Sequence, residues 1–325
     1  MSIKAKPNIP TALDIVQLQK GDKVGPWEVI RKLGEGGFGA VYLVRAGSNA
    51  KVEFALKAEK ASEVVKVLKM EVFVLGELKR KRAKHFCDLF DSGNIGNYNY
   101  VVMTLVGPSF HDLRKKYTDP AKQKFTLGCA LSIGIKCVEA IEELHSVGYL
   151  HRDIKPGNFA VGKSDYRKVL MLDFGMARKF LDAKGEIRKP RWAAGFRGTV
   201  RYAPLSCHIS REQCRKDDLE TWMYMQIELT KGYLPWKRIE NREEVGRCKD
   251  KCRNDNIQEL FGGCPKEYIH ILDYVDNLRY YDVPNYEKIR GFLRSGIAMN
   301  NVKEVPYDWE EKLKTEASEN RTVEA

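Results

Sequence analysis

The sequence has no long apolar stretch, because no run of about 18 or more apolar residues occurs among its 325 residues. It also lacks the apolar core of a secretory signal peptide at residues 1–10, and Ser2 stands where N-myristoylation requires glycine. These absences predict a protein that does not insert into a membrane. We expect it in the cytoplasm, with the nucleus as an alternative suggested by the basic run at residues 79–84.

Clustered cysteines are also absent, apart from one loose group. The eight cysteines are scattered, and only Cys248, Cys252 and Cys264 fall near one another. This group has no second close pair and no nearby histidine, so its spacing does not favour a zinc site. We expect reduced thiols, as in cytosolic enzymes.

Charge, in contrast, is in surplus of one sign. Lysine and arginine total 56 against 44 acidic residues, which gives a net charge of +12. Such a surplus favours anionic partners, namely nucleic acid, acidic lipid, or acidic or phosphorylated protein. No recognised nucleic-acid motif accompanies the charge, so we expect no specific binding of nucleic acid.

The central motif is the stretch H-R-D-I-K-P-G-N at residues 151–158. Phosphoryl transfer needs a carboxylate at the attacking hydroxyl, a cation at the transferred group and an oxygen ligand for Mg²⁺. Asp153, Lys155 and Asn158 are the candidate catalytic residues. Asn158 and Asp173, the latter from the following D-F-G motif, are the candidate ligands of Mg²⁺. This combination is the signature of the protein kinases, and it implies that ATP is the phosphoryl donor.

A glycine motif precedes it at residues 34–39. Because residues 41–44 have the pattern of a strand and not of a helix, we interpret the motif as a kinase glycine hairpin and not as a dinucleotide-binding turn. Lys57 occupies the position of the V-A-I-K lysine, and we expect Glu71, with Glu63 as the alternative, to pair with it from a helix spanning residues 61–79. The residues expected to bind ATP are Leu33, Gly34, Gly36, Gly39, Val41, Ala55, Lys57, Glu71, the gatekeeper Met103, and Thr104 and Val106 of the hinge.

The expected fold is α+β, namely the two-lobed protein kinase fold with a small β-rich N-lobe and a larger, mainly α-helical C-lobe. Residues 1–21 form an N-terminal arm in this interpretation, and residues 22–305 form the kinase domain. Within it the N-lobe covers about residues 22–103, the hinge residues 104–107 and the C-lobe residues 108–305. Residues 306–325 are expected to be a polar, loose tail.

Further motifs resemble the casein kinase one group across about residues 22–305, namely G-P-S at 107–109, G-T-V-R-Y-A at 198–203, D-D-L-E at 217–220 and L-P-W at 234–236. Residues 69–72 and 194–202 are more similar to its tau-tubulin kinase branch. The resemblance implies an ATP- and Mg²⁺-dependent serine/threonine kinase that favours acidic or already phosphorylated protein substrates, with cytoskeletal proteins among the candidates. We expect the protein to be a monomer. It places Arg201 and Arg247 at the substrate anion, and Asp218 beneath the catalytic loop.

The sequence departs from the group at two places, and from protein kinases in general at a third. Pro204 replaces a serine after the Tyr-Ala pair, and Trp222-Met223 replaces a Leu-Gly pair. The triplet at residues 203–205 lacks the glutamate of the usual A-P-E motif. Pro204 borders the expected substrate groove, so these departures bear on peptide preference and not on the phosphate chemistry.

The expected activation segment has no residue that can be phosphorylated. No Ser, Thr or Tyr lies between Gly175 and Thr199, so the usual activating phosphate gripped by arginines has no acceptor there. We therefore expect a kinase that needs no activation-loop phosphorylation. The same interval carries Asp182, Glu186 and seven cations, which are Arg178, Lys179, Lys184, Arg188, Lys189, Arg191 and Arg197.

Two other functions remain possible at this stage. One is a catalytically weak pseudokinase scaffold, and the other is a basic module that binds nucleic acid or microtubules. Pseudokinases usually lose at least one group of the phosphoryl-transfer set, whereas this sequence keeps all of them. An active kinase is therefore the favoured prediction.

Overall fold

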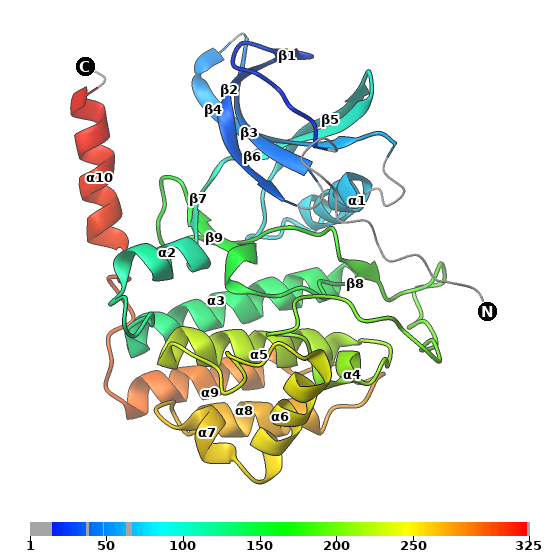
Figure 1. Cartoon of the computed structure of the whole chain (residues 1–325), viewed down its shortest axis with the longest axis vertical. Coiled ribbons are helices and arrows are strands. Elements are labelled where there is room, and N and C mark those ends of the chain that lie inside the picture. Colours follow the sequence, from blue (N-terminus) through cyan, green and yellow to red (C-terminus); the bar gives the residue numbers. More distant parts are fainter. Residues whose placement is uncertain (1–14, 37–38, 48, 63–66, 324–325) are drawn as a thin grey trace. The chain divides into compact units, whose positions relative to one another are not determined.

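The computed structural model describes residues 15–36, 39–47, 49–62 and 67–323 (Figure 1). The chain divides into two compact units. Unit 1 comprises Met1–Arg82 and Cys87–Val106, and unit 2 comprises Ala83–Phe86 and Gly107–Ala325. Unit 1 is built on a β-sheet and unit 2 is mainly helical, as the sequence predicts for a protein kinase fold.

The described residues of unit 1 contain one antiparallel sheet of six strands in the order β1-β2-β3-β4-β6-β5, together with one helix. Its elements are β1 Lys23–Val24, β2 Trp27–Gly36, β3 Gly39–Ala46, β4 Asn49–Lys60, α1 Val67–Arg80, β5 Leu89–Ile95 and β6 Tyr98–Thr104. The strand β7 Val106–Ser109 follows at the boundary between the units and pairs with β9 of unit 2.

Alternation of side chains gives the sheet its core. Ala40, Tyr42 and Val44 of β3 are fully buried because successive side chains of a strand point to opposite faces. Leu56 of β4 and Val16 of the preceding segment belong to the same hydrophobic cluster. The hydroxyl of Tyr42 donates to the carbonyl of Val16 at 2.6 Å, so the end of the predicted arm packs on the sheet.

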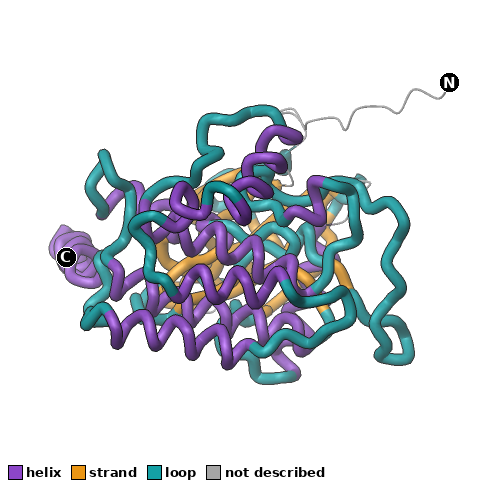
Figure 2. Tube along the Cα trace, turned by 90° about the horizontal axis from the view of Figure 1, so that it is seen from below, coloured by secondary structure: helices purple, strands orange, loops and turns teal. Residues whose placement is uncertain are grey.

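Unit 2 carries the remaining elements. Its helices are α2 Phe110–Tyr117, α3 Leu127–Ser146, α4 Leu205–His208, α5 Arg215–Lys231, α6 Arg242–Asn254, α7 Ile257–Phe261, α8 Glu267–Asp276, α9 Tyr286–Met299 and α10 Glu310–Val323. Its short strands are β8 Tyr149–Leu150, β9 Phe159–Gly162, β10 Val169–Met171 and β11 Arg178–Lys179, and Pro156–Asn158 forms a 3-10 turn. Seen from below, the long helices run alongside one another (Figure 2).

Helices α3 and α5 form the centre of unit 2. Both are buried on nearly every side. Helix α3 is apolar around most of its circumference, whereas α5 also buries charged residues, among them Asp218, Glu220 and Glu228. Trp222 and Met223, the pair that departs from the casein kinase one pattern, are both fully buried in α5. This departure therefore changes the packing of the interior and not an exposed surface.

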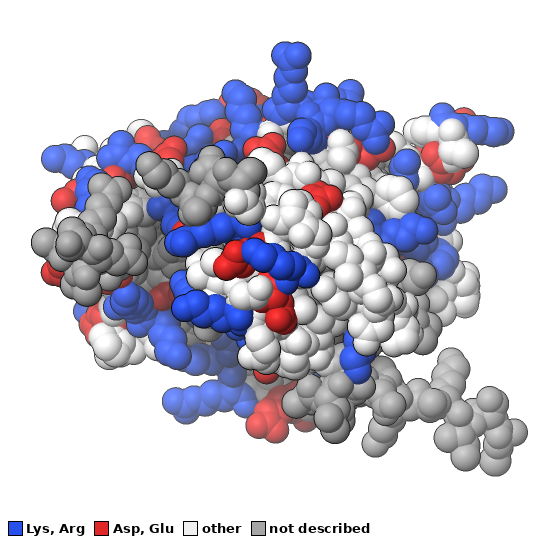
Figure 3. All heavy atoms as spheres, turned by 90° about the horizontal axis from the view of Figure 1, so that it is seen from above, with Lys and Arg blue, Asp and Glu red and all other residues white. Residues whose placement is uncertain are grey.

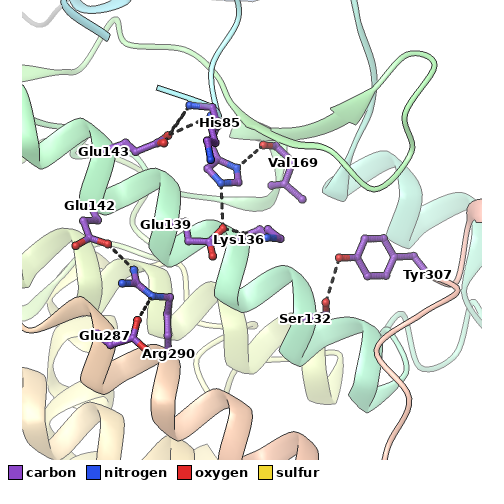
Figure 4. Close-up of polar contacts among 11 residues, drawn as sticks. His85, Ser132, Lys136, Glu139, Glu142, Glu143, Val169, Glu287, Arg290 and Tyr307 are labelled. Carbon is purple, nitrogen blue, oxygen red and sulfur yellow. Dashed lines mark hydrogen bonds and ion pairs between the residues drawn. The ribbon is translucent and has the colours of Figure 1, made fainter. Parts of the chain in front are cut away.

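The short segment Ala83–Phe86 is held within unit 2 (Figure 4). The carboxylate of Glu143 on α3 accepts the backbone N–H groups of Lys84 and His85, with Oε1 to Lys84 at 3.0 Å and Oε2 to His85 at 3.1 Å. The ring of His85 contacts the carbonyl of Val169 at 2.9 Å and the carboxylate of Glu139 at 3.1 Å. The hydrogen bond from His85 is the main reason that the pKa of Glu139 falls to about 2.

The C-terminal residues correct the expectation of a loose tail after Pro306. Tyr307 and Trp309 are buried, and Trp309 packs against Phe125 with ring centres 5.2 Å apart. The hydroxyl of Tyr307 also contacts that of Ser132 on α3 at 3.1 Å (Figure 4). Helix α10 then follows, and its Leu313 is buried as well. The composition is polar as predicted, but these few apolar residues attach the segment to unit 2.

Basic side chains are prominent on the surface (Figure 3). Lysine and arginine predominate over acidic residues on the face seen in Figure 3. None of the helices within the described part of the chain is both long and apolar enough to cross a membrane.

Candidate active site

The glycine motif forms the predicted hairpin in unit 1. Gly34 and Gly36 lie in β2 and Gly39 begins β3, while residues 37–38 at the tip lie outside the described part of the chain. Gly39 has φ of 147°, and a Cβ there would lie 2.1 Å from the carbonyl oxygen of Ala58. Only glycine fits such an approach without a shift of the backbone.

Lys57 of β4 and Glu71 of α1 form the predicted ion pair. The Nζ atom of Lys57 lies 2.8 Å from Oε2 of Glu71, and the Glu71 side chain is only 4% exposed. Five apolar residues of α1 that recur at helical spacing bury the face that carries Glu71: Val67, Leu68, Val74, Leu75 and Leu78. The alternative partner Glu63 lies outside the described residues.

Other predicted ATP-binding residues line the same sheet. Val41 in β3 is directly opposite Lys57 in β4, and Ala55 is opposite Met103 in β6. Leu33 in β2 is more than one-third exposed. The backbone N–H of Thr104 donates to the carbonyl of Asp88 at 3.1 Å, so this hinge donor is engaged within unit 1. Val106 begins β7.

Asp153 lies at the centre of the catalytic loop in unit 2. Its Oδ1 accepts both the backbone N–H of Thr199 at 2.9 Å and the hydroxyl of Thr199 at 2.7 Å. Its Oδ2 lies 2.7 Å from Nζ of Lys155. Thr199, which ends the interval that begins at Gly175, thus contacts the carboxylate of the catalytic loop directly.

Gly198 makes this contact sterically feasible. It has φ of +98°, and a Cβ at this position would lie 2.5 Å from the carbonyl oxygen of Arg152. The conformation is one that residues with a side chain rarely adopt. The glycine of the G-T-V-R-Y-A motif therefore allows the backbone of Thr199 to reach Asp153.

Asp218 of α5 anchors the catalytic loop as predicted. Its carboxylate accepts the backbone N–H groups of His151 at 2.8 Å and of Arg152 at 2.9 Å, and it contacts Nε2 of His145 at 2.8 Å. Arg152 has φ of 66°, an uncommon conformation for a residue with a long side chain. Burial alone would raise the pKa of Asp218, but the hydrogen bond from His145 and nearby charges lower it.

Asn158 and Asp173 are the candidates for Mg²⁺. The side-chain amide of Asn158 donates to the carbonyl of Asp153 at 2.8 Å, which leaves the amide oxygen as the ligand atom that the side chain can offer. Asp173 has φ of 62°, and its Oδ1 accepts the N–H of Gly175 at 3.2 Å. An amide oxygen and a carboxylate are hard ligands of the kind that Mg²⁺ prefers, so these residues fit the ion.

Comparison with known proteins identifies the family. The model of the protein kinase domain matches residues 27–275, about three-quarters of the chain. The chain belongs to the protein kinase family.

The relatives define the class of kinase. The chain is 38% identical over 309 residues to the serine/threonine-protein kinase spe-6 of Caenorhabditis elegans, covering 93% of this chain and 79% of the relative. It is 35% identical over 299 residues to a probable serine/threonine-protein kinase of Dictyostelium discoideum, covering 90% of this chain but only 58% of the relative. A casein kinase I homolog of Saccharomyces cerevisiae is 28% identical over 87% of this chain and 53% of its own length. The chain is therefore a serine/threonine protein kinase that is distantly similar to casein kinase I.

Residues 200–205, which follow Thr199 and end the activation segment of the kinase, are held by buried groups. The sequence patterns did not indicate this role for them. The backbone N–H of Leu205 donates to the carboxylate of Glu220 at 2.8 Å, and Glu220 in turn lies 2.8 Å from Arg253. Lys249 on α6 is fully buried and donates to the carbonyls of Val200 at 2.8 Å and Ala203 at 2.7 Å. Glu220 thus binds the residue that follows Pro204, where the A-P-E glutamate is absent.

Lys249→Met is expected to remove a pH dependence of the kinase's stability. Burial is the main cause that lowers the pKa of Lys249 from 10.5 to about 7. The unfolded chain therefore binds more protons than the folded chain between these values, so this residue makes the free energy of unfolding rise with pH, by up to about 1.4 kcal/mol per pH unit. Chemical denaturation across that window measures the difference between wild type and variant. Lys251→Met, an exposed position on the same helix, is the control, and parallel curves for wild type and Lys249→Met would contradict the prediction.

The two residues assigned to the substrate anion differ in their surroundings. Nη1 of Arg201 lies 3.0 Å from the carboxylate of Glu228, which is only 1% exposed, so Arg201 already has an internal counter-ion. Arg247 lies on α6 with an exposed side chain. Replacing Arg201 would remove a partner from a buried charge, and such a change destabilises the fold for reasons unrelated to substrate. Arg247 is therefore the cleaner position for a test.

The cysteines do not form a metal centre or a disulfide in the described part of the chain. No group of three or more His, Cys, Asp or Glu residues among the described positions can hold a metal ion. Cys248, Cys252 and Cys264 are present as thiols, and burial raises the pKa of Cys264 to about 12.

Proposed function

We propose that this kinase transfers the γ-phosphoryl group of ATP to Ser and Thr hydroxyls of acidic or already phosphorylated proteins, and that it needs no phosphate on its activation segment. Its place is in the casein kinase one group, nearest the tau-tubulin kinase branch, and its expected location is the cytoplasm. The observation that carries this proposal is the carboxylate of Asp153, which Thr199 and Lys155 each contact at 2.7 Å.

The residues divide the chemistry between them. Asp153 orients the substrate hydroxyl and accepts its proton, and Lys155 contacts the transferred phosphoryl group. Lys57, oriented by its ion pair with Glu71, binds the α- and β-phosphates. Asn158 and Asp173 would hold Mg²⁺, which neutralises charge on the phosphates when bound.

The preference for acidic substrates is supported by the distribution of charge. The chain has a net charge of +12, and the exposed cation of Arg247 lies on α6, the helix whose Lys249 binds the end of the activation segment. An anionic group on the substrate can form charge-assisted hydrogen bonds with such an arginine. The exposed cations Lys184, Arg188 and Lys189, which lie between Gly175 and Thr199, add to the attraction.

A comparison of peptides tests this preference. We expect a higher kcat/KM for a peptide with a phosphorylated or acidic residue N-terminal to the target Ser than for its neutral counterpart, and we expect added salt to reduce the ratio by screening. Arg247→Ala should lower the ratio several-fold with little change for the neutral peptide. Lys303→Ala, which removes an exposed cation from the loop after α9, is the control. Equal kcat/KM for the two peptides with wild-type enzyme would refute the proposed substrate class.

A further inference from the structure

One buried carboxylate of unit 2 is held by two arginines of the activation segment. Glu212 lies between α4 and α5, and its side chain is only 3% exposed. Nη2 of Arg191 donates to its Oε1 at 3.0 Å, and Nε of Arg191 donates to Oε2 in a second, short hydrogen bond. Nε of Arg178, on β11, lies 3.3 Å from Oε1. The two bonds from Arg191 form the paired geometry in which arginine binds carboxylates and phosphates most strongly.

The arginine of the catalytic loop belongs to the same group of charges. Nε of Arg152 donates to the carbonyl of Met176 at 2.8 Å, at the start of the activation segment. Burial and the nearby charge of Arg178 lower the pKa of Arg152 to about 10, while the charges of Asp218 and Glu212 act in the opposite direction. We call these four residues the Glu212 cluster. It brings together Arg152 of the catalytic loop, Arg178 and Arg191 of the activation segment, and Glu212 of the turn before α5.

Glu212 remains ionised in this setting. Burial alone would raise its pKa, but the hydrogen bond from Arg191 and the charges of Arg178 and Arg191 outweigh that effect and lower the pKa. A buried anion that several arginines share is the arrangement that an activating phosphate produces when it orders an activation segment. Here no Ser, Thr or Tyr lies between Gly175 and Thr199 to supply that phosphate.

We propose that Glu212 replaces the activating phosphate as a permanent anion that holds the activation segment in its ordered form. This inference rests on the proposed function, and it names the group that makes the enzyme active as synthesised. Glu212 is a positioning residue, because it contacts Arg191 and Arg178 and acts on the substrate only through the segment that they belong to. The next residue, Trp192, has a fully exposed side chain. The bonds from Arg191 to Glu212 therefore attach a part of the activation segment that otherwise faces solvent.

Glu212→Gln is the decisive variant, because glutamine keeps the shape and removes the charge. In phosphatase-treated enzyme we expect kcat/KM for a protein substrate to fall about tenfold or more, since the ordered segment is less populated. We expect ATP affinity to stay within about twofold of wild type. Trypsin should also cleave faster after the exposed Lys184 and Arg188. Arg191→Gln removes the two bonds from Arg191 to Glu212 while the contact with Arg178 remains. It should reproduce most of the effect if Glu212→Gln does not fold.

Glu310→Gln provides the matched control. Glu310 is also buried and bonded by one arginine, Arg167 at 2.8 Å, but it lies at the start of α10 and outside the cluster. We expect Glu310→Gln to lose about as much thermal stability as Glu212→Gln but to keep its activity and its resistance to trypsin. That result would show that Glu212 positions the activation segment and does not merely stabilise the fold. If Glu212→Gln keeps wild-type kcat/KM and wild-type cleavage, or if both variants lose activity in proportion to stability, the role of Glu212 is refuted.

An anion added from solution gives a test that a purely structural ion pair would fail. Glu212→Ala leaves space beside Arg178 and Arg191, and we expect inorganic phosphate to restore part of the lost kcat for a neutral peptide. Potassium chloride at the same ionic strength should not do so. No recovery with phosphate in a folded variant would contradict the proposal. Absence of transfer by wild-type enzyme would instead refute the proposed function, and a requirement of wild type for an upstream kinase would refute both the activation mode and the role of Glu212.

Discussion

Replacing Asp153 with asparagine is expected to lower kcat by about 10²–10⁴-fold, the range typical of a lost general acid or base. Asparagine keeps the size of the side chain, so one oxygen can still accept the hydrogen bonds of Thr199. The variant loses the negative charge beside Lys155 and the ability to accept the proton of the substrate hydroxyl. Initial rates with a protein substrate at saturating ATP measure the effect.

ATP affinity serves as the internal check on this variant. The residues expected to bind ATP lie in unit 1 and at its boundary with unit 2, apart from the Mg²⁺ ligands Asn158 and Asp173, so we expect the Kd of ATP to change by no more than about twofold. Asp250→Asn, an exposed position on α6, controls for the general effect of removing a carboxylate from unit 2. Turnover close to that of wild type in Asp153→Asn would show that another group accepts the proton.

Lys57→Arg is expected to lower kcat/KM by about 10²-fold or more, although the charge is retained. Lys57 places a compact ammonium 2.8 Å from Glu71, whereas arginine carries a planar group on a longer side chain. The pair is largely buried, with the Lys57 side chain 16% exposed, so the larger group cannot relax freely into solvent. An error of about 1 Å in the position of a phosphate is enough to produce such a loss.

Two measurements distinguish a lost phosphate contact from a disturbed fold. Lys69→Arg makes the same chemical change at an exposed position of α1 and should leave activity unaltered. A double-mutant cycle of Lys57→Met and Glu71→Gln should show strong coupling, because each variant alone removes the same ion pair. Independent, additive effects in that cycle would mean that the ion pair does not contribute to activity.

The sequence allowed most of the fold and the central contacts to be predicted, because their signals are local. Glycines that precede a strand indicated the hairpin of β2 and β3, and apolar residues at helical spacing placed Glu71 on the buried face of α1. The contact of Thr199 with Asp153 joins two short motifs that stand out in the sequence, although 46 positions separate them. In each case a few neighbouring residues carried the information.

The contacts that the sequence did not reveal join residues without a local pattern. Glu212 is a single acidic residue in a basic stretch, and nothing in its neighbours indicates that Arg191 and Arg178 will surround it. A lysine on a polar helix gives no sign that it will be buried as Lys249 is, since lysine is seldom found inside a protein. Tyr307, Trp309 and Leu313 did offer a signal in the tail, but three apolar residues among many polar ones were too few to outweigh the composition.

Because α10 is attached to unit 2, the part of this kinase that matches the family is shorter than the part that folds together. The stretch that shares ancestry with the family model ends at residue 275. The stretch that folds together extends further, since Trp309 closes the aromatic interior formed by Phe110 and Phe125. A fragment that ends where the family match ends would therefore expose an apolar surface that the whole chain covers. The limits of the smallest fragment that folds by itself should be chosen from the packing contacts and not from sequence similarity.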